Sequence, residues 1–476
     1  MAKEYETVIG LEVHVELATK TKIFCGCSTA FGGVPNTHTC PVCTGMPGSL
    51  PVLNRQVVEY AIAVGLATNC EITRYGKFDR KNYFYPDNPQ NYQISQLYLP
   101  ICRNGFVEVQ TEQGSKKIGI HEIHMEEDAG KLIHDEWEDV SLVDYNRSGV
   151  PLIEIVSEPD MRSAEEVIAY LEKLRMIIQY LGASDCKLQE GSMRADVNLS
   201  VREVGAEAFG TRTEMKNLNS FRAIAHAIEG ERERQIDLLT AGEPVIQETR
   251  RWDDGKGCSY AMRSKEDAQD YRYFPDPDLV PVVVDDEWLA RIRAAQPEFR
   301  SEKLERYKRE FDIPEYDIEI ITASKRMADL FEETTAICGQ PKKVSNWLMV
   351  ETMRLLKEKG MEPEDIRRAV PVIKDIIRAY NCDADRLAHE YVSRFSLQPQ
   401  KRKEVEQWYA DLCDMMRSEG KLSHGHLQIC NNVLQELTEL NQQLLHSSKF
   451  PYYREIYYKV LPYIVELRGK NAADNA

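Results

Sequence analysis

The stretch Ile9-Gly-Leu-Glu-Val-His-Val-Glu-Leu17 alternates between apolar residues and residues of other kinds. Successive side chains of a β-strand point to opposite faces of a sheet, so the apolar residues share one face. The opposite face carries Glu12, His14 and Glu16. The stretch therefore predicts a strand that buries one face and gathers acids and an imidazole on the other.

The same alternation returns at residues 194–201, and Gly-, Pro-, Asn- and Asp-rich turns separate such strands throughout residues 1–297. The polar face of the second stretch carries Arg194, Asp196, Asn198 and Ser200. Helical patterns interrupt the strands at 164–181 and 220–239. A mixed or antiparallel sheet with helices on one side indicates the α+β class.

The pattern changes after the turn-rich segment 270–281 to charged stretches with Leu and Ile at helical spacing. We expect a catalytic domain over 1–297, a helical domain over 298–365 and a helical tail over 366–476. The helices expected in these all-helical C-terminal domains include 301–311, 326–331, 404–417 and 427–445.

The composition limits the partners and the location. The chain has 476 residues and a net charge of −17, which argues against general affinity for nucleic acids because phosphate contacts need clustered Lys and Arg. Any RNA contact must use a local basic surface or a partner protein. Residues 1–6 show no apolar signal region, and no apolar run approaches the ~20 residues of a membrane span. We therefore expect a cytoplasmic protein without a membrane segment.

Four of the twelve cysteines form two close pairs, Cys25-Gly-Cys27 and Cys40-Pro-Val-Cys43. Four thiolates on short loops can surround one Zn²⁺ tetrahedrally, and a site with four sulfur ligands leaves no position open for water. The pattern predicts a structural zinc knuckle over 25–43, with His38 as a weaker ligand candidate. The alternative is four unrelated buried thiols.

Acidic residues on polar strand faces form the second candidate site. Carboxylates from several strands can converge on Mg²⁺, which prefers oxygen ligands and keeps waters for substrate phosphates. The alternative is that these acids cover solvated strand faces. The candidates are Glu12, His14, Glu126, Glu127, Asp128, Asp196 and Glu214.

The sequence contains neither a G-x-x-x-x-G-K-[ST] phosphate loop nor the protein-kinase motifs. An ATP site would therefore depend on metal-binding carboxylates and on basic side chains such as Arg80, Lys81, Lys131 and Lys216. No cysteine has a recognisable catalytic context and no Gly-Ser-rich amidase segment is present. If the chemistry uses ammonia, another protein must release it.

Eight ordered motifs resemble the B subunit (GatB) of the tRNA-dependent amidotransferases, and the resemblance covers roughly the first 350 residues, including Ser345-Asn-Trp-Leu348. The motifs are VIGLEVHVEL (8–17), KFDRKNYFYPDNPQNYQISQ (77–96), HMEEDAGK (124–131), DYNRSGVPLIEIVSEPD (144–160), EGSMRADVNLSVR (190–202), EMKNLNSF (214–221), QETRRWD (247–253) and DYRYFPDPDLVP (270–281).

This resemblance implies a glutamine-synthetase-like cradle and an ATP-dependent carbon–nitrogen ligase. Such a protein phosphorylates the side-chain carboxylate of Glu-tRNA(Gln) or Asp-tRNA(Asn), and ammonia from glutamine then forms the amide. It implies an amidase (A) subunit and a small C subunit as partners, mischarged tRNA as substrate, and a zinc knuckle that only some members carry.

The resemblance also implies roles for individual residues. Those expected to hold magnesium are Glu12, His14, Glu126, Glu127 and Glu214, and the catalytic set is Glu12, His14, Glu127 and Glu214. The residues expected to contact ATP follow instead from the absence of a phosphate loop, and they are Arg80, Lys81, Lys131, Asp196 and Lys216.

The tail departs from the family, because neither the usual Gly-Phe-Leu-Val-Gly stretch nor the pattern leading to it follows residue 362. Two other functions stay open at this point. One is a stand-alone ligase that amidates a small free acid. The other is a non-catalytic, zinc-stabilised RNA-binding module, which would keep its function after Glu127→Gln or Glu214→Gln.

Overall fold

The computed structural model describes residues 4–134, 140–262 and 271–363. Contacts between Cα atoms divide the chain into two units, with the division between Glu305 and Arg306. The expected tail over 366–476, with its helices at 404–417 and 427–445, lies outside the described residues. The domain boundary at 297 stays a prediction.

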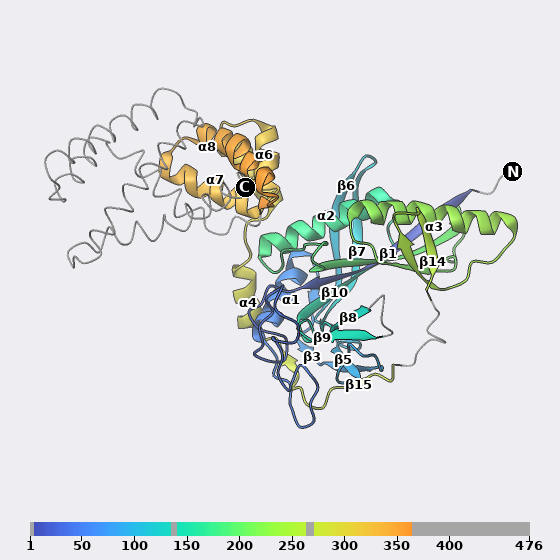
Figure 1. Ribbon diagram of the computed structural model, residues 1–476. Coiled ribbons are helices and arrows are strands. Elements are labelled where there is room, and N and C mark those ends of the chain that lie inside the picture. The colour runs from blue at the N-terminus through green and yellow to red at the C-terminus, as the bar shows by residue number, and fades with distance from the viewer. Residues whose placement is uncertain (1–3, 135–139, 263–270, 364–476) are drawn as a thin grey trace, which may run out of the picture. The chain divides into compact units, whose positions relative to one another are not determined.

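A nine-stranded mixed sheet forms the centre of the first unit (Figure 1). Neighbouring strands are antiparallel except for β12 and β13, which run parallel. In spatial order the strands are β14 (Cys258–Ala261), β13 (Thr249–Asp253), β12 (Thr213–Lys216), β11 (Met193–Glu203), β1 (Tyr5–Glu16), β10 (Pro151–Ser157), β7 (Gly114–Glu127), β6 (Cys102–Thr111) and β2 (Glu71–Ile72).

The two strands expected from alternation are β1 and β11, and they lie side by side at the middle of the sheet. On β1 the apolar residues from Ile9 to Val15 are at most 1% exposed, whereas Glu12, His14 and Glu16 are half-buried on the other face. Burial of the apolar face excludes a slip of the strand by one residue, because such a slip would turn every apolar side chain outward. The predicted polar face is confirmed.

Helices cover the apolar face of the sheet. Helices α1 (Arg55–Ala67), α2 (Ala164–Leu181) and α3 (Phe221–Ala241) supply apolar side chains to the same core as β1, β7 and β11, and α2 and α3 run side by side in Figure 1. The hydroxyl of Ser163 accepts a hydrogen bond from the Glu166 N–H at the start of α2, and Gly182 ends it at φ 67°. The predicted helix over 164–181 is therefore confirmed.

Smaller strand pairs and one further helix complete the first unit. A three-stranded sheet contains β15 (Phe274–Pro275), β4 (Asp79–Asn82) and β5 (Tyr92–Ser95). Two pairs are β16 (Val282–Val283) with β3 (Tyr75–Gly76) and β8 (Lys131–His134) with β9 (Ser141–Asp144). Helix α4 covers Asp286–Ala294. The α+β class is confirmed, and the glutamine-synthetase-like topology stays a prediction.

The described part of the second unit is helical. After α5 (Arg300–Glu310), at whose midpoint the two units divide, follow α6 (Glu315–Thr322), α7 (Lys325–Cys338), α8 (Pro341–Trp347), a π-helical turn η1 (Leu348–Thr352) and α9 (Met353–Lys359). The rings of Tyr307, Phe311 and Phe331 pack with centroids 5.1 to 5.3 Å apart. In the part of the chain that the structure describes, no helix combines the length and apolar character that a membrane crossing requires.

Candidate functional site

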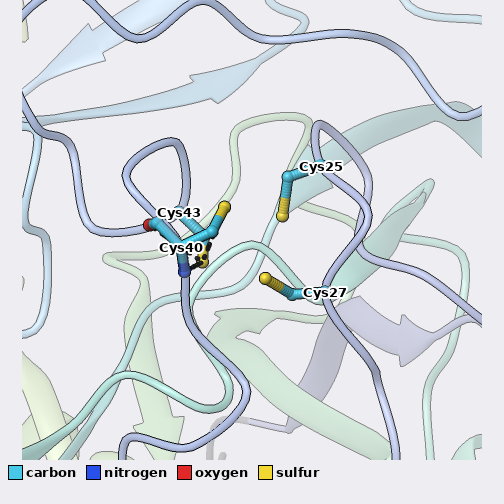
Figure 2. Close-up of side chains that lie close together, drawn as sticks. All are labelled: Cys25, Cys27, Cys40 and Cys43. Carbon is cyan, nitrogen blue, oxygen red and sulfur yellow. Dashed lines mark hydrogen bonds between the residues drawn. The ribbon is translucent and has the colours of Figure 1, made fainter.

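The four predicted cysteines, which follow β1 in the sequence, lie close together in the structure. Figure 2 shows the sulfur atoms of both pairs pointing toward one another. The four sulfur atoms all lie within 4.8 Å of one another. The Sγ atoms of Cys40 and Cys43 are 3.9 Å apart. Zn–S bonds of ~2.3 Å in a tetrahedron place sulfur atoms ~3.8 Å apart. The cluster is therefore compatible with a structural metal ion.

Cys43 is the member best prepared to act as a thiolate. A hydrogen bond from the Cys25 thiol, the backbone N–H of Cys40 and the charge of Lys22 together lower the pKa of the Cys43 thiol to about 4, although burial opposes them. Metal binding requires the thiolate form of cysteine. These contacts favour the thiolate form of Cys43 over its neutral thiol.

Lys22 supports this charge state, because its side chain is completely buried. Its ammonium donates to the backbone carbonyl of Tyr145 at 3.1 Å and to Sγ of Cys43 at 3.5 Å. A buried ammonium is costly unless it meets an anion. A thiolate at Cys43 supplies that anion, whereas a neutral thiol would not.

A row of ionisable side chains crosses the polar face of the large sheet. Residues directly opposite one another in antiparallel strands share a face. His14 on β1 lies opposite Arg194 of β11 and Glu154 of β10, and Glu154 lies opposite His124 of β7. The adjacent row pairs Glu12 with Asp196. Side chains from four strands therefore meet on the face opposite the helices.

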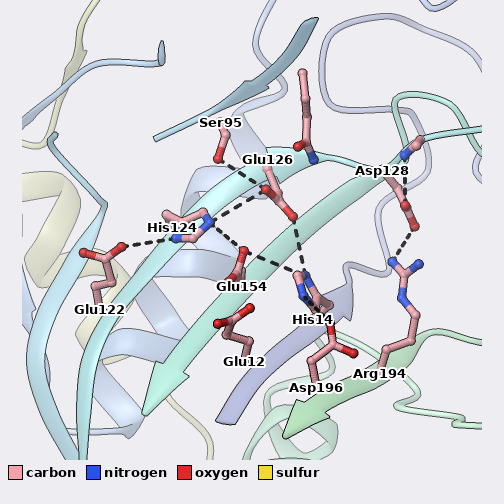
Figure 3. A network of polar contacts seen from close by, with 12 residues as sticks. Glu12, His14, Ser95, Glu122, His124, Glu126, Asp128, Glu154, Arg194 and Asp196 are labelled. Atoms are coloured by element: carbon pink, nitrogen blue, oxygen red, sulfur yellow. Dashed lines mark hydrogen bonds and ion pairs between the residues drawn. The ribbon is translucent and has the colours of Figure 1, made fainter. Parts of the chain in front are cut away.

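Two histidines bind the carboxylates of this row together (Figure 3). Nδ1 of His14 lies 3.5 Å from Glu126 and 3.9 Å from Glu154, and its Nε2 lies 4.0 Å from Asp196. Nε2 of His124 lies 3.0 Å from Glu154. We call the whole set the acidic cluster. Its members are Glu12, His14, Glu122, His124, Glu126, Glu154, Asp196 and Glu214.

The protonation of the acidic cluster follows from these contacts. Burial would raise the pKa of Glu126, but hydrogen bonds from His124 and His14 outweigh it and lower that pKa. Burial likewise opposes protonation of His14, and the neighbouring carboxylates Glu126, Glu154 and Asp196 raise its pKa nonetheless. Burial and the charges of Glu154 and Glu214 raise the pKa of Glu12. The cluster thus carries more negative charge than its histidines neutralise.

The ligand geometry gives two trios that share His14. One potential ligand atom from each of Glu12, His14 and Asp196 lies within 4.8 Å of the other two, and the same holds for His14, Glu126 and Glu154. Carboxylate oxygens suit Mg²⁺. The donor set therefore fits a hard divalent cation, with His14 between the two groups of acids.

Two further residues hold the end of the acidic cluster on β12. The ammonium of Lys216 lies 2.7 Å from Oε1 of Glu214 and 2.5 Å from Oδ2 of Asp196. The hydroxyl of Thr249 on β13 donates to Oε2 of Glu214 at 2.7 Å. Both oxygens of Glu214 therefore have partners, Lys216 on the same strand β12 and Thr249 on the adjacent strand β13.

Glu127 faces a different environment from Glu126, as expected for successive residues of a strand. Its Oε1 accepts from the N–H of Ile94 and from the amide of Gln90, both at 3.0 Å. Burial, aided by Asp276, raises the pKa of Glu127 to about 8. Glu127 belongs to neither trio, so its predicted role in magnesium binding stays a prediction.

The four basic residues expected to contact ATP have different neighbours. Arg80 pairs with Asp276 and Asp278, each at 2.7 Å. The ammonium of Lys81 lies 4.9 Å from the Tyr271 ring centroid. Lys131 is exposed on β8. Of the four, Lys216 is the one that contacts the acidic cluster.

A cavity of about 210 Å³ lies between the cysteine cluster and β5. Its lining includes Lys22, Cys25, Cys43, Arg80, Tyr92 and Glu127. The cavity therefore borders both the cysteine cluster and the carboxylate of Glu127.

Glu154 and His124 were not among the residues predicted for the site. Glu154 is the one acid in the apolar strand β10, where it occupies the polar face, and that isolation is a usable signal. His124 stands two residues before Glu126, so strand alternation puts both on the same face.

Comparison with known proteins agrees with this architecture. A family model described as the GatB/GatE catalytic domain matches residues 7–290. The chain is 81% identical over 365 residues to the B subunit of the aspartyl/glutamyl-tRNA(Asn/Gln) amidotransferase of Agathobacter rectalis, covering 77% of each chain. The B subunits of the amidotransferases of the same name from Lachnospira eligens and Caldicellulosiruptor bescii are 78% identical over 359 residues and 63% identical over 363 residues. The alignment with the Lachnospira protein covers 75% of this chain and 74% of the relative, and the alignment with the Caldicellulosiruptor protein covers 76% of each.

A second family model, described as a domain of unknown function, matches residues 372–476, where the sequence lacks the expected family ending. The first family model and these relatives cover well over half of the chain. The chain therefore belongs to the family of aspartyl/glutamyl-tRNA(Asn/Gln) amidotransferase B subunits.

Proposed function

We propose that this chain uses ATP to activate the side-chain carboxylate of Glu-tRNA(Gln), of Asp-tRNA(Asn) or of both, and then amidates it. The observation that carries the proposal is the acidic cluster, in which acids from several strands surround His14. The names of the relatives supply the class of substrate.

The reaction has two balanced steps. A carboxylate oxygen of the aminoacyl side chain attacks the γ-phosphorus of ATP and ADP leaves, which gives an acyl phosphate. Ammonia attacks the acyl carbon, inorganic phosphate leaves and the amide forms after loss of a proton. Mg²⁺ bound by these acids would neutralise phosphate charge during the first step.

The chain's own residues have separate tasks in this proposal. Glu12, Asp196, Glu126 and Glu154 would hold the cation, and His14 orients acids on both of its sides. Nε2 of His124 contacts both Glu154 and Glu126 and would hold their carboxylates in position. Lys216 would supply a positive charge for phosphate oxygens.

Ammonia requires a second protein, because the sequence offers no nucleophile for glutamine hydrolysis. We infer an amidase subunit and a small third subunit as partners, with glutamine as the nitrogen donor. The net charge of −17 leaves tRNA binding to a local surface or to these partners.

The test is reconstitution of the chain with an amidase subunit and a small third subunit in the presence of ATP, Mg²⁺ and glutamine. We expect amide formation on Glu-tRNA or Asp-tRNA and none on free glutamate. Equal amidation of free glutamate would favour the stand-alone ligase. Tight tRNA binding without any ATP-dependent amidation would favour the non-catalytic module.

We also propose that the four cysteines bind zinc. The support is the close approach of all four sulfur atoms and the buried ammonium of Lys22 beside the Cys43 sulfur. With four sulfur ligands the ion would be structural.

Lys22→Met is expected to speed the loss of zinc to a chelator by about tenfold, because a zinc tetrathiolate carries excess negative charge that the buried ammonium offsets. Zinc release can be followed with a colorimetric chelator. Lys256→Met removes an exposed lysine and is the control. Equal release rates for Lys22→Met and the unsubstituted protein would contradict this role.

A further inference from the structure

Lys216 occupies the space between two acids that are expected to serve a cation. Asp196 comes from β11 and Glu214 from β12, and the ammonium lies 2.5 Å from the first and 2.7 Å from the second. The side chain of Lys216 is 37% exposed, so its ammonium has room to move toward solvent. A lysine thus neutralises this end of the acidic cluster in the described structure.

The same oxygen of Asp196 serves both the lysine and the first trio. Oδ2 of Asp196 lies 4.0 Å from Nε2 of His14, and Asp196 forms a trio with Glu12 and His14. A Mg²⁺ ion bound to that oxygen at ~2.1 Å would lie within ~5 Å of the ammonium. Charges of like sign at that distance repel strongly in a partly buried site. Cation and ammonium therefore compete for Asp196.

We propose that Lys216 takes the place of a cation in the acidic cluster while ATP is absent, and releases Asp196 and Glu214 when phosphate oxygens become available to it. This inference rests on the proposed function. Lysine is a compact cation on a flexible stem and binds phosphate well as a point charge. ATP and the divalent cation then bind cooperatively. Phosphate oxygens draw the Lys216 ammonium away from Asp196, which frees that acid for the cation, and the cation in turn releases the ammonium for the phosphate.

The second trio provides an internal comparison. Its acids, Glu126 and Glu154, are held by the two histidines rather than by Lys216. Loss of the lysine should therefore strengthen cation binding at Glu12 and Asp196 and leave the trio at Glu126 unaffected. A cation site at Glu12 is predicted to depend on the nucleotide more strongly than one at Glu126.

The experiment measures Mn²⁺ binding to the full-length chain by electron paramagnetic resonance, with and without a non-hydrolysable ATP analogue. Lys216→Met is expected to bind Mn²⁺ about tenfold more tightly than the unsubstituted chain when the analogue is absent. With the analogue the unsubstituted chain should gain affinity, and the variant should gain little. Lys216→Gln repeats the test if the methionine variant does not fold.

Lys256→Met is the matched control, because it also removes one positive charge from an ion pair, with Asp253 at 3.6 Å, but from the turn between β13 and β14, which contributes no residue to either trio. Suppose that substitution of Glu12 weakens Mn²⁺ binding but that Lys216→Met binds Mn²⁺ no more tightly than the unsubstituted chain. That result would overturn the inference and leave the proposed function standing. Absence of Mn²⁺ binding in every variant, with and without nucleotide, would overturn both.

Discussion

Glu12→Gln is expected to lower the rate of ATP-dependent amidation of aminoacyl-tRNA by about a hundredfold or more. Removal of one anionic ligand weakens cation binding, and a bound cation contributes several kcal/mol to stabilising charge in phosphoryl transfer, at ~1.4 kcal/mol for each tenfold in rate. Glu12 is held by the Asn198 amide at 2.9 Å and has Asp196 and His14 within 4.8 Å. Glutamine keeps the size of the side chain, so the fold should persist.

The measurement is the initial rate of amide formation in the reconstituted complex as the Mg²⁺ concentration varies. Loss of a ligand should also raise the Mg²⁺ concentration needed for half of the maximal rate, which a purely structural role would not. Glu158→Gln is the matched control, because Glu158 likewise lies beside a histidine, with His121 at 2.9 Å, but is 44% exposed. A rate for Glu12→Gln within twofold of the control's rate would argue against a catalytic cation at this place.

Local pattern was sufficient to predict the elements that carry the acidic cluster. The alternation at Ile9–Leu17 predicted β1 and its polar face because one face of the strand is buried throughout. The helical pattern predicted the helix over 164–181 to its last residue, and in the structure Ser163 and Gly182 cap its two ends. Such features depend only on neighbouring residues.

The meeting of these acidic side chains at one place depended on pairing between strands that are far apart in the sequence. The β1–β10 register puts Glu154 opposite His14, and nothing in the alternation of either strand specifies that register. The same limit explains why Thr249 was not predicted beside Glu214: β12 and β13 are parallel strands joined across the whole of α3. By contrast, the separation of Glu126 from Glu127 follows from strand geometry alone.

The cysteine cluster was the easier of the two sites to predict, because all four residues lie within one short segment and close spacing limits how far their sulfur atoms can separate. Lys22 was the part that the spacing could not reveal. Its ammonium reaches Cys43 and the carbonyl of Tyr145, a residue from the turn before β10, so its role depends on tertiary structure.

Cys40→Ser is expected to release zinc and to destabilise the first unit by about 3 kcal/mol or more, since loss of a structural metal is among the larger effects of a single substitution. The cluster ties the segment after β1 to the rest of the unit: Lys22 N–H bonds to the Cys27 carbonyl at 3.0 Å, and the Ser148 hydroxyl donates to the Cys43 carbonyl at 2.9 Å. A shift in melting temperature of roughly 5 to 10 °C would correspond to that loss.

Metal analysis of protein purified under reducing conditions, followed by thermal unfolding, measures both effects. Cys258→Ser removes an exposed cysteine outside the cluster and should change neither zinc content nor melting temperature. Because the cysteines and the acidic cluster are separate groups, the Mg²⁺ dependence of Cys40→Ser should stay unchanged in whatever fraction remains folded. Unsubstituted protein that contained no zinc would show instead that the four thiols pack together without a metal, with the buried ammonium of Lys22 and the Ser148 hydroxyl still holding the segment after β1.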